Sequence, residues 1–184
     1  MIYVLLFVIH AWVLWGHRVK MGTDPKDRPQ DPIFSRHLQI LAFTALLLTQ
    51  AAVMVHRILN PVNTKLHLTL GVIVFFSGLA LRLWSVRILG RLFTFEIGIR
   101  PEHRIIEEGP YRFIRHPSYT GYLLILAGIS VAYSSWFLFL TTFLSAVGFL
   151  LVRIRQEEKM LLSHFGPAYA EYIKRTKRLI PFLY

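Results

Sequence analysis

The chain has 184 residues, of which 54% are hydrophobic and 14% aromatic, and its mean hydropathy is +0.48. Long apolar runs in so short a chain favour a single membrane-embedded domain over residues 1–184 and argue against a soluble protein. The formal net charge of +11 is compatible with binding to nucleic acid or to an anionic membrane surface, and the absence of cysteine excludes disulfides, thiolate nucleophiles and thiolate metal sites.

Four apolar regions predict five membrane-spanning helices. The first region, residues 1–16, has no basic segment before it and no small-residue cleavage site before Arg18, so we interpret it as a retained anchor. The last region, residues 119–152, is too long for one crossing, and we expect Ser134 and Ser135 to divide it into two spans. The predicted spans cover residues 2–17, 37–59, 66–88, 118–133 and 136–153 approximately.

The positive charges orient these spans. Of the 21 Lys and Arg residues, 19 lie in three segments that five crossings place on one side, namely residues 17–36, 82–115 and 153 onward. Arg57 and Lys65 lie on the other side. The positive-inside rule therefore predicts an external N-terminus and a cytosolic C-terminus. This distribution explains the net charge, and with no compact recognition motif in the sequence we expect no nucleic-acid partner.

The cytosolic segments carry the polar residues. Residues 17–36 mix Pro, Gly and charge, as loops do. Residues 93–100, FTFEIGIR, alternate apolar and polar side chains, which predicts a short strand, and residues 104–106 are expected to return as the second strand of a small β-hairpin.

Beyond the fifth span the helical pattern continues to Gly166, where Gly followed by Pro167 is a stop signal. A second amphipathic helix is predicted within residues 167–179, with Tyr169 and Tyr172 on one stripe. The predicted fold is thus an all-α integral membrane protein, with a helical hairpin at spans four and five, a cytosolic β-hairpin and C-terminal amphipathic helices.

The start of the fourth span has the composition of a ligand site. Pro110 and Pro117 prevent a regular helix from running through this segment, and Pro117 suits the first turn of the span. The helix N-terminus favours an anion. Basic and aromatic side chains surround it, namely Arg112, Arg115, His116, Tyr111, Tyr119 and Tyr122. The Glu157–Glu158 pair supplies carboxylates suited to a ribose, an amine or a cationic centre, so the combination predicts a zwitterionic, purine-bearing ligand.

Three sequence blocks carry a resemblance to a known family. GPYRFIRHPSYTGY (109–122), YSSW (133–136) and QEEKMLLSHFGPAYAEYIKRTKRLIP (156–181) resemble the C-terminal signature of the isoprenylcysteine carboxyl methyltransferases. These are small integral-membrane enzymes related to phospholipid N-methyltransferases. The resemblance covers about the last 95 residues, whereas the first 80 match only as apolar spans and a basic loop.

The resemblance implies S-adenosyl-L-methionine as the cofactor, bound at the cytosolic face by residues within 89–122 and 153–184. The cofactor-binding residues it implies are Tyr111, Arg115, His116, Pro117, Tyr119, Gly121, and Glu157 or Glu158. For Arg115 and His116 the alternative is a lipid-headgroup anchor at a helix end. The short chain lacks the extra N-terminal spans of larger family members, which favours a prokaryotic inner membrane.

The methyl acceptor determines which catalytic residues are needed. A carboxylate acceptor is already ionised and needs an arginine to orient it, for which Arg153 is the first candidate and Arg178 the second. An amine acceptor needs a carboxylate to take its proton, a role for Glu157 or Glu158. We expect a lipid-like or prenylated acceptor that stays in contact with membrane lipids. His10, His56 and His67 lack ligand spacing, so no metal site is predicted.

Carboxyl O-methylation of an isoprenylcysteine-type substrate is the favoured function. The alternatives are N-methylation of an amino-headgroup phospholipid, a sterol-type reductase with a nicotinamide cofactor, and a non-catalytic membrane binding protein. The reductase is disfavoured because the chain leaves no room for a second cofactor half.

Overall fold

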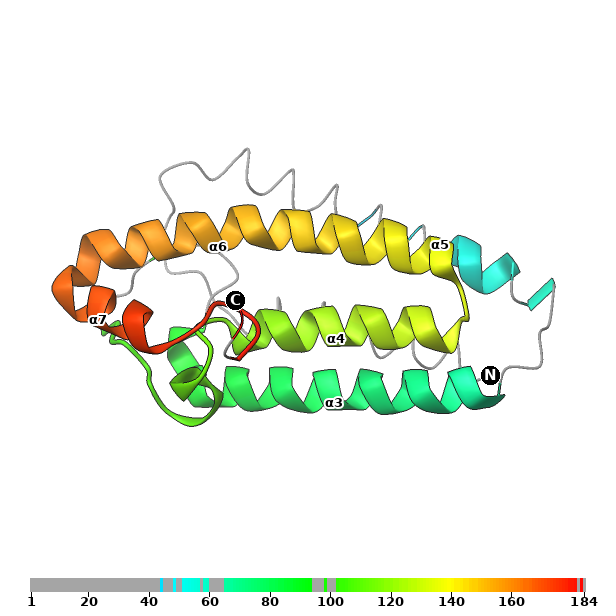
Figure 1. Ribbon diagram of the computed structural model, residues 1–184, viewed down its shortest axis with the longest axis horizontal. Helices are drawn as coiled ribbons and strands as arrows, with labels where there is room; N and C mark the ends of the chain where they lie inside the picture. Colours follow the sequence, from blue (N-terminus) through cyan, green and yellow to red (C-terminus); the bar gives the residue numbers. More distant parts are fainter. Residues whose placement is uncertain are drawn as a thin grey trace.

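The structure, a computed structural model, describes residues 44, 48, 51–56, 58, 59, 65–93, 98, 102–181 and 183. The predicted first span, the loop at 17–36, much of the second span and most of residues 93–100 lie outside the described residues. The numbering of the helices below follows Figure 1.

The long helices α3, α4 and α6 lie side by side, each antiparallel to its neighbour (Figure 1), and α7 lies at one end of the bundle with α5 at the other. The described elements are α3 (Lys65–Leu89), η2 (Gly90–Leu92), η3 (Gly109–Arg112), α4 (Pro117–Ala132), α5 (Trp136–Leu138), the π-helical turn η4 (Phe139–Phe143), α6 (Leu144–Phe165) and α7 (Pro167–Arg175). The helices over 65–92 and 139–165 are long and apolar enough to cross a membrane, and α4 is a shorter apolar helix.

The interface between α3 and α4 depends on glycine. A Cβ atom at Gly121 would lie 2.7 Å from the carbonyl oxygen of Gly78, and one at Gly128 would lie 2.4 Å from the backbone nitrogen of Phe75. Only hydrogen at these positions lets the two backbones approach so closely, as small residues do between membrane helices. The core beside this interface includes Phe75, Ile125 and Ile129, all fully or almost fully buried.

The turn between α4 and α5 lies where the sequence predicted a break. α4 ends at Ala132, Ser134 has a positive φ of 50°, and α5 begins at Trp136. α5, η4 and α6 then follow one another without interruption, so the last long helix runs from 136 to 165. It ends at Gly166 with φ 53°, and Pro167 starts α7, as the Gly-Pro signal predicted.

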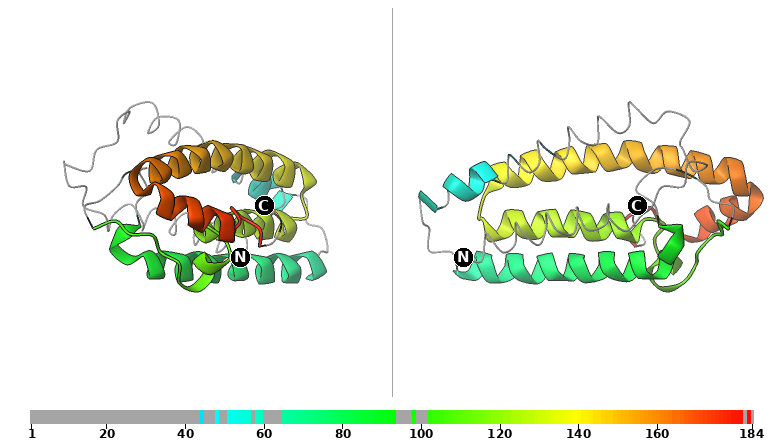
Figure 2. Two further views of the ribbon diagram at one scale, coloured as in Figure 1. Left: turned by 60° about the vertical axis from the view of Figure 1, so that its left-hand side comes forward. Right: turned by 180° about the vertical axis from the view of Figure 1, so that it is seen from behind.

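The chain folds back at the charged end of the bundle. α7 turns under α6, and the segment after it returns to the start of α4 (Figure 2). There the backbone nitrogens of Arg115 and His116 donate to the carbonyls of Lys177 and Arg178, at 2.7 and 3.0 Å, and Lys177 donates to the carbonyl of Phe113 at 3.1 Å. This parallel pairing joins residues 113–116, just before α4, to residues 177–178, just after α7.

The predicted β-hairpin is not supported. Residues 104–106, the expected second strand, are irregular, and the described part of the chain contains no strand beyond an isolated bridge between Ile114 and Lys177. Ile105 and Ile106 instead line a cavity together with Phe93. The apolar side chains of Ile105 and Ile106 therefore face a cavity, and neither residue belongs to a strand.

Candidate active site

A cavity opens where α4 begins and the charged part of α6 passes beside it. Its empty space is about 870 Å³, counted out to the open mouth. Its polar lining includes Tyr111, Arg115, His116, Tyr119, Arg153 and Glu157. Its apolar lining includes Leu89, Ile105, Ile106, Leu161 and Phe165. An apolar cavity with a few convergent polar groups is the usual form of a small-molecule site.

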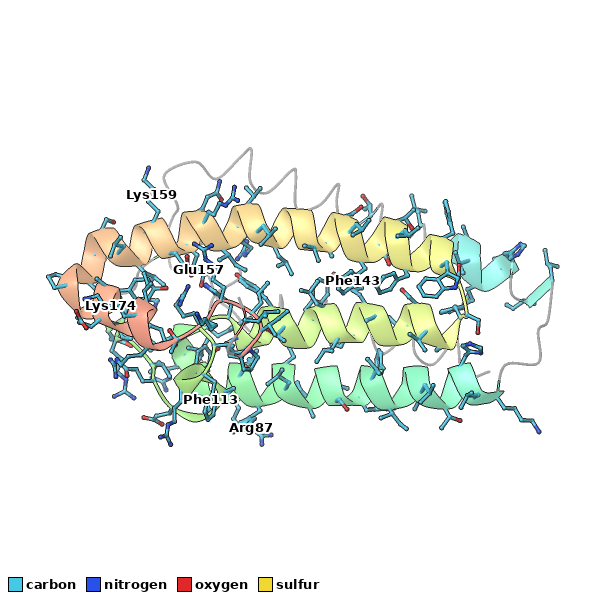
Figure 3. The ribbon with its side chains drawn as sticks, viewed as in Figure 1. Arg87, Phe113, Phe143, Glu157, Lys159 and Lys174 are labelled. Atoms are coloured by element: carbon cyan, nitrogen blue, oxygen red, sulfur yellow. The ribbon has the colours of Figure 1, made fainter. Side chains whose placement is uncertain are left out.

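Tyr119 joins two helices across this cavity. Its hydroxyl donates to Oε2 of Glu157 at 2.8 Å and accepts from Nε of Arg153 at 2.7 Å. Arg153 and Glu157 lie four residues apart on α6, so one turn of that helix presents both partners to the same hydroxyl. Figure 3 shows Glu157 on the side of α6 that faces α4, whereas Lys159 points away from the bundle.

His116 lies against this group. Its ring stacks on Tyr119, with centroids 5.5 Å apart and planes 13° from parallel. Its Nδ1 lies 4.0 Å from Oε2 of Glu157, and its Nε2 lies 3.4 Å from Oε1 of Glu158 without hydrogen-bond geometry. His116, which is the N-cap residue of α4, therefore lies between the two carboxylates.

Glu158 has a different environment from its neighbour. Oε1 accepts from Nε of Arg115 at 2.7 Å, and Oε2 accepts from Nε of Arg178 at 2.9 Å. Its side chain is 8% exposed, against 29% for Glu157. Two charge-assisted hydrogen bonds on a buried carboxylate form a strong structural contact.

Arg115 fixes the C-terminal segment. Besides Glu158, its guanidinium donates through Nη1 to the carbonyl of Thr176 and, at 3.3 Å, to that of Ile173. Thr120 on α4 donates to the carbonyl of Leu179 at 2.7 Å. The planar fork of arginine donates in several directions at once, and here it ties the start of α4, α6 and the end of α7 together.

Tyrosines that line the cavity keep their hydroxyl protons. Burial raises the pKa of Tyr111 well above its ordinary value, and the nearby Glu157 carboxylate raises it further. Burial likewise raises the pKa values of Tyr169 and Tyr172 on α7. Tyr172 uses its proton to donate to the carbonyl of Tyr111 at 2.8 Å. At neutral pH these side chains are therefore uncharged.

The structure brings most of the predicted site residues together. Tyr111, Arg115, His116, Tyr119, Arg153 and Glu157 all line the cavity. Pro117, Gly121, Glu158 and Arg178 are not among its lining residues. Pro117 is buried in the first turn of α4, and Gly121 forms the α3–α4 contact.

Other lining residues were not predicted as site residues. The sequence placed Tyr169 and Tyr172 on one stripe of a helix, but it did not indicate that this stripe would face the cavity. Ser118, His103 and Met160 also line the cavity. These three have no distinctive sequence pattern, because their positions follow from how α4, α6 and the 102–108 segment meet.

Comparison with known proteins gives consistent matches. The Isoprenylcysteine carboxyl methyltransferase (ICMT) family matches residues 69–163. Protein-S-isoprenylcysteine O-methyltransferase B of Arabidopsis thaliana is 35% identical over 122 residues, which cover 61% of this chain and 58% of the relative. The protein-S-isoprenylcysteine O-methyltransferase of Saccharomyces cerevisiae is 32% identical over 129 residues, covering 65% of this chain and 51% of the relative.

A solved structure supports the fold. The chain is similar to the eukaryotic intramembrane Ras methyltransferase isoprenylcysteine carboxyl methyltransferase, with a TM-score of 0.66 at 24% identity, covering 85% of this chain and 55% of that one. The chain thus spans between half and three-fifths of the length of these three proteins. All three are eukaryotic, so the matches give no support to the expected prokaryotic inner membrane.

Proposed function

Because the chain belongs to the isoprenylcysteine carboxyl methyltransferase family, we propose that it is an integral-membrane enzyme that transfers a methyl group from S-adenosyl-L-methionine to the carboxylate of an isoprenylcysteine-type acceptor. The observation that carries the proposal is the cavity between α4 and α6. It brings Arg115 and His116 of the R-H-P turn (residues 115–117) together with Glu157, which lies far from them in the sequence.

The residues of this cavity fit the proposed cofactor. The side chain of Glu157 is partly exposed, at 29%, and offers a carboxylate to a cationic or hydroxyl group. Arg115, His116 and the start of α4 supply a positive field for a carboxylate, and the tyrosines supply flat surfaces for a purine. When bound, S-adenosyl-L-methionine supplies an electrophilic methyl group, whose C–S bond breaks as an acceptor oxygen bonds to carbon, leaving a neutral thioether and requiring no proton transfer.

The protein side chains then serve to position the two reactants and to exclude water. Tyr119 holds Arg153 and Glu157 in fixed orientations, so the cation and the carboxylate on α6 keep their spacing. Arg153 is the residue we assign to orient the acceptor. Arg178, the second candidate, is bound to Glu158 and acts by holding that carboxylate.

The exposed apolar surfaces of α3 and α6 are consistent with an acceptor embedded in the membrane. α3 exposes large apolar side chains, among them Leu70, Ile73 and Phe76, and α6 exposes Leu144 and Val152. We propose that the prenyl chain stays in hydrocarbon beside these helices while its polar end enters the cavity. Each buried methylene contributes about 0.8 kcal/mol to that partition. Activity on acceptors with one polar head should therefore rise steeply with tail length.

One assay tests the reaction and the acceptor class together. Purified protein in detergent is given S-adenosyl-L-methionine with a labelled methyl group and a farnesylated N-acetylcysteine. Incorporated label that alkali releases as methanol is the expected result, since a carboxyl methyl ester is base-labile. Alkali-stable label on added phosphatidylethanolamine would instead indicate the N-methyltransferase. Absence of both transfer and S-adenosylhomocysteine binding would leave a non-catalytic protein.

A further inference from the structure

Arg82 is a charged side chain buried in the long apolar helix α3. It is 4% exposed. Its Nη1 donates to both the carbonyl and the hydroxyl oxygen of Ser118, each at 3.1 Å. Its guanidinium carbon lies 5.5 Å from the centre of the Tyr122 ring. The side chain therefore crosses from α3 to the first turns of α4.

This cation has no counter-ion among the residues that the structure describes. No described carboxylate forms an ion pair with Arg82, and its buried Nε has no hydrogen-bond partner there. A buried charge is costly unless it is paired, and an ionisable residue inside a membrane span is by default a functional one. Among the described residues, Arg82 has two contacts to neutral oxygens and one to an aromatic face, and none of these carries a negative charge.

Arg82 adjoins the cavity through Ser118. Ser118 accepts both hydrogen bonds from Arg82 and also lines the cavity. On the other side of α4, the guanidinium of Arg153 lies 5.9 Å from the centre of the Tyr119 ring. Two arginines, from α3 and α6, thus flank two tyrosines that lie one helical turn apart on α4.

We propose that Arg82 is a second acceptor-binding residue, acting with Arg153, and that it supplies a counter-charge for the carboxylate of the methyl acceptor at the Ser118 side of the cavity. The inference rests on the proposed function. Arg82 lies on a helix long and apolar enough to cross a membrane, which matches an acceptor whose tail lies in hydrocarbon. An ionised carboxylate brought to this depth loses its hydration and needs a fixed cation in return. Arg82 provides that cation in a water-poor environment.

The cofactor is a second possible source of a carboxylate for Arg82. The amino-acid end of S-adenosylhomocysteine also carries a carboxylate. We assign Arg82 to the acceptor, because the start of α4, where His116 and Arg115 line the cavity, already offers the cofactor's carboxylate a positive field. The two sources are separated by measuring the binding of each compound.

The decisive quantity is the ratio of affinities for a farnesylated N-acetylcysteine and for its neutral primary amide. The variants are Arg82→Gln and Arg82→Lys, with Arg87→Gln as the matched control, because Arg87 is exposed on the outer face of α3 (Figure 3). We expect Arg82→Gln to lower the acid-to-amide ratio about tenfold or more, since the charge-specific contact is lost. Amide binding and S-adenosylhomocysteine affinity should stay within about twofold, and Arg87→Gln should change none of these quantities.

Two results would overturn the proposal. One is an unchanged acid-to-amide ratio in Arg82→Gln, which would make Arg82 structural. The other is a loss of S-adenosylhomocysteine affinity with the ratio unchanged, which would assign Arg82 to the cofactor. If Arg82→Gln does not fold, Arg82→Lys decides: a ratio lowered about threefold supports the proposal, and an unchanged ratio overturns it. Wild-type protein that methylates no carboxylate acceptor would refute the proposed function itself.

Discussion

Glu157 and Glu158 are adjacent on α6, yet Glu157 lines the cavity whereas Glu158 is buried between Arg115 and Arg178. Consecutive residues on a helix point about 100° apart, so only one of the two can face a given site. The structure therefore assigns them different tasks: Glu157 contacts the site, and Glu158 holds it together.

Substitution of the two glutamates should separate these tasks. Glu157→Gln should lower S-adenosylhomocysteine affinity about tenfold with little change in thermal stability, because it removes a partly exposed charge from the cavity. Glu158→Gln should lower the apparent melting temperature by about 5 °C or more, because it removes the negative charge that pairs with the buried guanidinium of Arg115. Calorimetry and thermal unfolding in the same detergent measure both effects. Equal losses of affinity and stability in the two variants would contradict the assignment.

Tyr119→Phe should impair turnover more than cofactor binding. The variant keeps the ring that stacks on His116 but removes the hydroxyl that joins Arg153 to Glu157. We expect kcat to fall about tenfold to a hundredfold, since misplacing a positioning group is costly in catalysis. The double variant with Glu157→Gln should be no worse than the poorer single variant, as residues that act together are not additive. Fully additive losses would show that the hydroxyl does not work through Glu157.

Arg115→Lys should destabilise the charged end of the bundle although it preserves the charge. Lysine cannot reproduce the fork that contacts Glu158, Ile173 and Thr176 together. The matched control is Arg112→Lys, because Arg112 is exposed on η3. Limited proteolysis of the C-terminal segment should be faster in Arg115→Lys than in wild type or in the control. Identical cleavage rates for all three proteins would contradict the structural role.

Gly121→Ala should destabilise the protein by about 1–3 kcal/mol through overpacking. A Cβ atom there would lie 2.7 Å from the carbonyl oxygen of Gly78 and 2.8 Å from the backbone nitrogen of Arg82. Gly148→Ala is the control, because a Cβ atom at Gly148 meets nothing within 4 Å, and alanine favours helix. Thermal unfolding checks the pair. A Gly121→Ala protein as stable as wild type but unable to bind S-adenosylhomocysteine would return Gly121 to the cofactor site.

The sequence was sufficient for features that depend on local chemistry. Apolar length and the Gly166–Pro167 pair predicted, to within a residue or two, where α3 begins and ends and where the continuous helix of α5, η4 and α6 begins and ends. The break at Ser134 followed from the length limit of one crossing. Residue types and the family resemblance predicted one site for the R-H-P turn and either Glu157 or Glu158, and the structure places Glu157 beside Arg115 and His116 on one cavity.

Features set by tertiary contact could not be predicted in the same way. The burial of Glu158 depends on Arg178, which reaches it only because residues 177–179 return to α4. Residues 104–106 form no strand, and their side chains line a cavity that the sequence does not reveal. In the sequence, Arg82 is one of seven basic residues of the segment 82–115, and its burial follows from the packing of α3 against α4.

The return of residues 177–179 to the start of α4 also sets the order in which the protein matures. This segment is synthesised after every element that it holds in place. The long helices can therefore enter the bilayer, pair through their glycines and reach their final depth while the R-H-P turn still lacks its backbone partners. We expect a chain halted before residue 176 to be correctly inserted and yet unable to retain the methyl donor. Biogenesis and activity are thus separated in time, and a protein still in the insertion machinery would consume no donor.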